Sequence, residues 1–331
     1  MLMLSPPALL FSICLISGIF ISISSSSWFM AWVGLELNLL SFIPLITHKR
    51  NTFSSEAAFK YFLIQALGSA ILLATVPLLL MFTISPKVLM FCSLILKMGA
   101  APLHFWLPAI MQGMTWPNCI ILMTAQKIAP ILLLSYILCS QTMILFTTTS
   151  IMSAIIGGLG GLNQTLMRKL MAYSSINHMA WMLAALSLST PLWVHYIITY
   201  SLISSSLGIL FNHTQIFHIK HLMNISSSQI NKTLMFLTLF SLGGLPPFLG
   251  FIPKMSVIKE LVNQSLLVWS FILTMSTLIT LFYYVRLTLT SLTMVSPKTG
   301  QESKLSNQKI SSITFINLLP LIFPLTIVIP L

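Results

Sequence analysis

Long apolar stretches separated by short polar ones run from one end of the chain to the other. Each approaches or exceeds the ~20 residues that a helix needs to cross the hydrocarbon core of a bilayer. Backbone groups in lipid must be hydrogen-bonded within the protein, and the alternation of a membrane β-barrel is not visible, so the stretches are predicted to be helices. The pattern predicts an all-α polytopic membrane protein, a single membrane domain over residues 1–331, with about eleven transmembrane helices, at residues 2–23, 28–46, 57–84, 87–108, 116–138, 142–161, 170–189, 191–217, 233–262, 265–291 and 311–330.

Composition narrows the class of protein. Hydrophobic residues make up 56% of the 331 residues and charged residues only 6%, against roughly 25% charged residues in a typical soluble domain. The mean hydropathy is +0.96. These values exclude a soluble enzyme, a disordered chain and a nucleic-acid-binding domain, so lipids, and not nucleic acid, are the expected surroundings of the chain.

The distribution of charge predicts the orientation. There are 16 Lys and Arg residues against 4 Asp and Glu residues, and the basic ones form no stripe or run. With eleven spans the two termini lie on opposite faces, and the loops on the N-terminal face hold most of the positive charge. The N-terminus is therefore predicted on the positive-inside face. The loops on that face carry Lys49, Arg50, Arg168, Lys169, Lys220, Lys232, Lys298, Lys304 and Lys309, whereas those on the other face hold little beyond Lys87 and Lys259.

Two of the apolar segments contain residues that interrupt a helix. Proline removes a backbone donor and clashes with the preceding turn, so both segments are predicted to be broken helices. Such breaks at membrane depth line a cavity or lie buried in protein, and in transporters they mark the ion path. A packing kink is the alternative, and it is stronger for the fourth segment. The fourth segment holds the run Gly99–Pro102, and the ninth holds Gly243, Gly244, Pro246 and Pro247.

Four ionisable residues lie inside the predicted spans: Glu36, Lys97, Lys127 and Lys254. A charge at the centre of a span costs at least ~2.5–3.5 kcal/mol, which is usually tolerated for function. Three lysines facing one glutamate cannot all be charged and paired one to one, so the sequence favours a proton relay. The alternatives are a structural ion pair between Glu36 and Lys97, and snorkelling of Lys127 or Lys254 to the membrane surface.

Two histidines are further candidates. His178 lies mid-span and is either a proton carrier or a hydrogen-bonded core residue. His104, in Leu-His-Phe-Trp, is either a relay member or a residue at the membrane interface, and the interface is slightly favoured.

Other features predict structure rather than chemistry. Gly157 and Gly161 have the spacing of close helix packing. No dinucleotide, Walker, metal-ligand or Cys-x-x-Cys pattern occurs, so the chain is expected to bind no nucleotide, flavin or metal. The four cysteines are predicted to be buried apolar residues, at positions 14, 92, 119 and 139.

Several motifs taken together carry a resemblance to a known family. They are Trp32–Asn38, Glu56–Phe62, Lys97–Trp106, Gln126–Pro130, Gly160–Lys169, Ser174–His178 and Ser241–Pro247. The chain resembles, over nearly its whole length, the mitochondrially encoded antiporter-like membrane-arm subunits of NADH:ubiquinone oxidoreductase, respiratory complex I. Ala125 and Ala180 depart from the family pattern, and neither position holds a titrating group.

The resemblance implies an antiporter-like fold with two broken helices and a proton channel on Glu36, Lys97, Lys127 and Lys254, with Glu36 paired to Lys97. It implies a multi-pass protein of the mitochondrial inner membrane, with its N-terminus in the matrix and other membrane-arm subunits, antiporter-like ones included, as partners. Electron transfer, with NADH, FMN, iron–sulfur clusters and ubiquinone, would belong to other subunits. Two rival functions remain open: a structural scaffold of the same arm, and a free-standing cation/proton antiporter.

Overall fold

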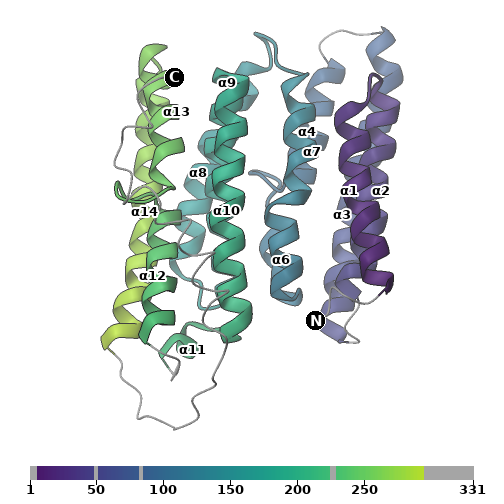
Figure 1. The fold of residues 1–331 in the computed structure, drawn as a ribbon. Helices are drawn as coiled ribbons and strands as arrows, with labels where there is room; N and C mark the ends of the chain where they lie inside the picture. The colour runs from purple at the N-terminus through teal and green to yellow at the C-terminus, as the bar shows by residue number, and fades with distance from the viewer. Residues whose placement is uncertain (1–5, 48–50, 82–84, 224–228, 294–331) are drawn as a thin grey trace. The chain divides into compact units, whose positions relative to one another are not determined.

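The computed structural model describes residues 6–47, 51–81, 85–223 and 229–293, and within these ranges the regular structure is helical apart from one isolated bridge. This confirms the predicted all-α class. The helices follow one another along the chain (Figure 1) as α1 Pro6–Ser24, α2 Trp28–Thr47, α3 Thr52–Met81, α4 Ser85–Met98, α5 Trp106–Gly113, α6 Trp116–Met123, α7 Ala125–Ser135, α8 Met143–Leu162, α9 Met167–Leu188, α10 Thr190–Thr214, α11 Ile219–Met223, α12 Gln229–Gly243, α13 Phe251–Asn263 and α14 Leu267–Thr293.

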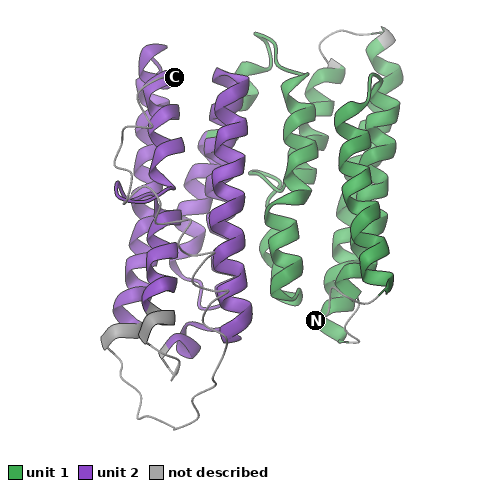
Figure 2. Cartoon of the chain, in the orientation of Figure 1, with its two compact units in different colours: residues 1–150 green, residues 151–331 purple. Residues whose placement is uncertain are grey.

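The helices gather into two compact units (Figure 2). Unit 1 comprises residues Met1–Ser150 and unit 2 comprises Ile151–Leu331. In unit 1, α1 packs on α2, α2 and α4 pack on α3, and α7 contacts α1, α2 and α4. In unit 2, α9, α12 and α13 each contact both α10 and α14, and α13 also contacts α9. The single membrane domain stays a prediction.

Seven helices in the described ranges are long and apolar enough to cross a membrane. The 22-residue α9 is long enough as well, but it is less apolar, because its middle carries Ser174, Ser175, Asn177 and His178. The fourth and ninth predicted segments each appear as a pair of shorter helices, α4 with α5 and α12 with α13. The last segment, 311–330, lies outside the described residues, so the exact count of eleven stays a prediction.

Both predicted breaks are present, and the first half-helix ends with the same backbone geometry in each. The first half-helix ends in a glycine with positive φ: Gly99 at +75° closes α4, and Gly244 at +78° closes α12. In each case the glycine N–H and the next N–H bond to the carbonyl at the start of the last turn, Ile95 in α4 and Phe240 in α12. This is the usual glycine C-cap of a helix, which a side chain with a Cβ disfavours.

A third interruption, at Thr124 between α6 and α7, was not predicted. Thr124 has φ −115° and ψ −78°, and its hydroxyl donates to the Ile120 carbonyl at 2.7 Å. Neither proline nor glycine occupies this position, so the sequence carries no ordinary signal for the break.

Apolar side chains cover much of the outer surface of the helices. Leu10, Phe20, Phe59, Phe271 and Phe282 are all exposed, as expected where the solvent of a helix bundle is lipid. The same fact corrects the prediction for the cysteines. Of the four, Cys119 is buried, whereas Cys92 is exposed, because an apolar residue in a span need not face the protein interior.

Two loops at one end of unit 2, the one before α9 and the one after α10, contact each other. The Met167 N–H donates to the Phe217 carbonyl at 2.9 Å, and the Arg168 guanidinium lies 4.6 Å from the centre of the Phe217 ring. Arg286 donates to the Leu162 carbonyl at 2.6 Å near the same loops. Arg168 and Arg286 therefore lie at the same end of this unit. Lys49, Arg50, Lys298, Lys304 and Lys309 lie outside the described residues.

Candidate functional site

A small polar cavity lies inside unit 1, between the two buried lysines Lys97 and Lys127. It leaves about 20 Å³ for the centres of water molecules, and a single water needs roughly 10–15 Å³. The cavity therefore has room for at least one water, and both lysines are among its lining residues. Its lining comes from helices α2 to α7 and comprises Leu35, Asn38, Leu39, Tyr61, Gln65, Lys97, Met98, Trp106, Leu122, Gln126, Lys127 and Pro130.

Lys97 lies in the last turn of α4, one residue before that helix ends. The break leaves the last carbonyls of α4 without the usual helical partner four residues on; the Gly99 N–H reaches the Leu96 carbonyl at 3.2 Å, and two neighbouring side chains also donate here. The Trp106 indole N–H donates to the Leu96 carbonyl at 3.0 Å, and the Gln65 amide donates to the Lys97 carbonyl at 3.2 Å. The C-terminal end of a helix carries partial negative charge, which favours a cation there. The break thus supplies a stabilising field for a protonated Lys97.

Lys127 lies in the first turn of α7, immediately after the interruption at Thr124. Its backbone N–H bonds to the Thr124 carbonyl at 3.1 Å instead of continuing the α-helical pattern of α6. Its side chain is 2% exposed. Snorkelling of Lys127 to a surface is therefore excluded within unit 1, because the amine is enclosed by protein.

Polar side chains from three helices form a hydrogen-bonded chain along the cavity wall. The Tyr61 hydroxyl donates to Gln126 Oε1 at 3.2 Å, and Gln126 Nε2 donates to Asn38 Oδ1 at 2.8 Å. Asn38 and Gln126 belong to motifs that the sequence singled out, but their meeting depends on the packing of α2 against α7. Tyr61 lies within the motif Glu56–Phe62. Gln65, four residues further along α3, carried no signal beyond being a polar residue in an apolar segment.

Glu36 lies close to the site without lining the cavity. The cavity face of α2 is formed by Leu35, Asn38 and Leu39, and at 100° per residue Glu36 lies off this face. Its charge acts on Lys97 and Tyr61 through space. The expected direct pair with Lys97 is not formed within 4 Å, whereas Glu56 and Lys60 do form an ion pair.

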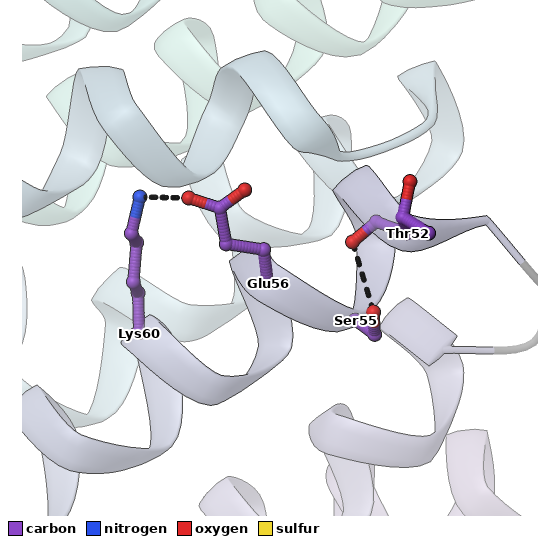
Figure 3. Close-up of polar contacts among 4 residues, drawn as sticks. All are labelled: Thr52, Ser55, Glu56 and Lys60. Atoms are coloured by element: carbon purple, nitrogen blue, oxygen red, sulfur yellow. Dashed lines mark hydrogen bonds and ion pairs between the residues drawn. The ribbon is translucent and has the colours of Figure 1, made fainter.

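The Glu56–Lys60 pair has the character that its spacing predicts. The two side chains lie one turn apart at the start of α3, near Thr52 and Ser55 (Figure 3), and both are exposed. An exposed pair of this kind contributes at most about 0.5 kcal/mol to stability. It has no contact with the cavity.

Lys254 lies in the first turn of α13 in unit 2, and its side chain is 5% exposed. Its amine donates to the Gly243 carbonyl at 2.9 Å and to the Leu242 carbonyl at 3.5 Å. These are the terminal carbonyls of α12, so Lys254 also lies at the negative end of a glycine-capped half-helix. The non-helical residues between the two halves, 244–250, include Pro246 and Pro247.

The two candidate histidines are both buried. His104, in the break between α4 and α5, makes a 3.1 Å hydrogen bond between Nδ1 and the Pro102 carbonyl, and its ring lies 4.2 Å from that of Phe105. Whether it is a relay member or an interfacial residue stays a prediction. His178, on α9, makes a 2.9 Å hydrogen bond between Nδ1 and the Tyr196 hydroxyl.

No metal centre is apparent in the described part of the chain. There, no group of three or more His, Cys, Asp or Glu side chains is placed to hold an ion. The chemistry that the buried groups of unit 1 can perform is proton exchange, because amines, a phenol and amides surround a space the size of a water molecule.

Comparison with known proteins gives a consistent result. The family model described as "NADH:quinone oxidoreductase/Mrp antiporter, TM" matches residues 25–88 and 81–280. The chain is 46% identical over 321 residues to NADH-ubiquinone oxidoreductase chain 2 of Anopheles gambiae, covering 93% of this chain and 92% of that one. It is 48% identical over 288 residues to the protein of the same name from Aedes aegypti, covering 84% of each chain.

Solved structures share the fold at low sequence identity. A chain of respiratory complex I from Thermus thermophilus with bound aureothin matches with a TM-score of 0.82 at 22% identity, over 96% of this chain and 78% of that one. A chain of the Mrp complex from Dietzia matches with a TM-score of 0.77 at 17% identity, over 89% of this chain and 62% of that one. These similarities establish the antiporter-like fold.

Proposed function

Because this chain belongs to the NADH-ubiquinone oxidoreductase chain 2 family, within the NADH:quinone oxidoreductase/Mrp antiporter family, we propose that it translocates protons in the membrane arm of respiratory complex I through a relay of buried lysines. It is a multi-pass membrane subunit of NADH:ubiquinone oxidoreductase, and its partners are other membrane-arm subunits. Electron transfer from NADH to ubiquinone on other subunits drives the relay. We further propose that it resides in the mitochondrial inner membrane with its N-terminus in the matrix.

The observation that carries the proposal is the pair Lys97 and Lys127 on one water-sized polar cavity. Two ammonium groups at one small cavity repel each other. Such a pair is more stable when one proton is shared than when both amines are charged. A proton that leaves one amine through the bridging water is accepted by the other.

Glu36 and Lys254 have distinct parts in this relay. Glu36 acts on Lys97 from outside the cavity, so its charge biases which lysine holds the proton. The protonated amine of Lys254 is stabilised by the terminal carbonyls of α12. Lys254 is the next proton-carrying residue of the relay and lies in unit 2.

Methionine variants of the two cavity lysines test the proposal in the assembled complex. Lys97→Met and Lys127→Met keep the apolar stem and remove the amine, so they are expected to lower the number of protons pumped per electron while assembly on native gels persists. Lys60→Met, on the exposed surface of unit 1, is the matched control and is expected to pump normally.

The same variants separate the relay from its rivals. In a scaffold role the lysines only hold the structure together. This role predicts one of two results: the Met variants do not assemble, or they assemble and pump protons at the normal ratio. A free-standing antiporter would be purified without complex I subunits and would retain ion exchange in isolation.

A further inference from the structure

Four tyrosines of unit 2, two of them next to His178, are buried and are not used by the relay described above. Tyr196 and Tyr200 lie four residues apart and therefore share one face of α10. Tyr283 and Tyr284 come from α14, with ring centres 4.7 Å apart. All four side chains are buried. The hydroxyl of a buried tyrosine usually has a hydrogen-bond partner.

His178 lies between the two tyrosines of α10. Its Nδ1 is 2.9 Å from the Tyr196 hydroxyl, and its ring centre is 4.8 Å from that of Tyr200. The Tyr200 hydroxyl lies near the Ser175 side chain on α9. An imidazole and two phenols thus meet in one buried patch between α9 and α10.

The patch continues from His178 toward Lys254. The Tyr284 hydroxyl lies next to Ser174 and Tyr283, but it meets neither in hydrogen-bond geometry. The edge of the Tyr284 ring lies 3.6 Å from the position of a Cβ on Gly243. The carbonyl of that same glycine accepts the Lys254 hydrogen bond at 2.9 Å.

The hydroxyls of Tyr283 and Tyr284 are buried and have no well-formed hydrogen bond to any described residue. Buried hydroxyls in proteins are nearly always hydrogen-bonded, to protein or to ordered water. Ordered water is the usual partner of a buried hydroxyl that no protein group satisfies.

We propose that Tyr200 and Tyr284, with Tyr196 as the partner of His178, are proton-transfer residues that connect Lys254 to His178 inside unit 2. This inference rests on the proposed function, because it extends the relay beyond Lys254. The Lys254 ammonium gives up a proton and becomes a neutral amine. Each phenol accepts a proton on its oxygen and releases its own hydroxyl proton onward, so it ends neutral. His178 takes the proton and becomes an imidazolium.

Phenylalanine variants test the cluster, since Tyr→Phe keeps the ring and removes only the hydroxyl. In the assembled complex in vesicles, Tyr200→Phe and Tyr284→Phe are expected to slow NADH-driven proton transfer about tenfold, which corresponds to on the order of 1.4 kcal/mol in the barrier. The number of protons per electron should fall while assembly is normal. Tyr136→Phe is the matched control, because Tyr136 is exposed outside the cluster.

The outcomes separate this inference from the proposed function. If Lys127→Met stops pumping while both phenylalanine variants behave like Tyr136→Phe, the tyrosine pathway is wrong and the lysine relay stands. If Lys127→Met also pumps normally, the proposed function fails as well. Should one phenylalanine variant fail to assemble, the other variant and Tyr196→Phe decide by the same measurement.

Discussion

Gly244→Ala adds one methyl group at the point where Lys254 meets the end of α12. Gly244 has a φ of +78°, and a Cβ there would lie 2.8 Å from the Lys254 amine nitrogen and 2.9 Å from its Cδ. The side chain of Lys254 must therefore move away from the Gly243 carbonyl. The substitution is expected to disturb the lysine without changing any titratable group.

Two terms set the size of the effect. The left-handed backbone conformation costs a residue with a Cβ about 1–2 kcal/mol, which lowers stability but does not act on proton transfer. A hydrogen bond from a charged donor contributes about 1.5–3 kcal/mol, and its loss removes the preferred position of the Lys254 proton. Since about 1.4 kcal/mol corresponds to tenfold in a rate, pumping is expected to fall by at least tenfold.

The assay compares Gly244→Ala with Gly158→Ala in vesicles that contain the assembled complex. Gly158 has no left-handed backbone, and a Cβ there would make ordinary contacts at 3.4 Å or more. Proton pumping and thermal stability are measured on both variants. Pumping by Gly244→Ala at the rate of Gly158→Ala would refute the idea that the end of α12 positions Lys254.

Three further predictions concern other parts of the chain. Hydrogen bonds from Thr142 lower the pKa of the Cys139 thiol, so Thr142→Val should raise this pKa. The variant should therefore react more slowly with an impermeant maleimide near pH 7, but at the same rate as the parent protein at high pH. The maleimide should reach Cys139 from the membrane face opposite the N-terminus. Gly157→Val should prevent assembly, because its Cβ would lie 2.5 Å from a backbone nitrogen of α9; normal complex levels on native gels would contradict this. Glu36→Gln should reduce pumping less than Lys97→Met, because the carboxylate acts from beyond 4 Å; an equal loss would indicate a direct pair.

The sequence predicted the features that depend on local chemistry. Gly99, Gly244 and Pro246 marked breaks that the structure contains, because positive φ and the missing proline N–H act within one turn. The close packing expected at Gly157 is also confirmed, since a Cβ there would overlap α9. The interruption at Thr124 was missed because threonine is common inside spans and bends a helix only when its hydroxyl bonds backward.

The composition of the candidate site was harder to predict. Lys97 and Lys127 stood out because a charge in an apolar segment is costly. Tyr61 and Gln65 gave no comparable signal, since polar uncharged residues occur throughout the spans. Their convergence on one cavity is set by how α3 packs against α4 and α5. The tyrosines around His178 were missed for the same reason.

The central claim is that Lys127 works by releasing its proton. Lys127→Arg tests it most directly, because the guanidinium group keeps the positive charge but stays protonated at any relevant pH. The measurement is the number of protons pumped per electron by the assembled complex in vesicles. The relay predicts a reduced ratio with normal assembly, whereas an unchanged ratio would contradict a relay through this lysine.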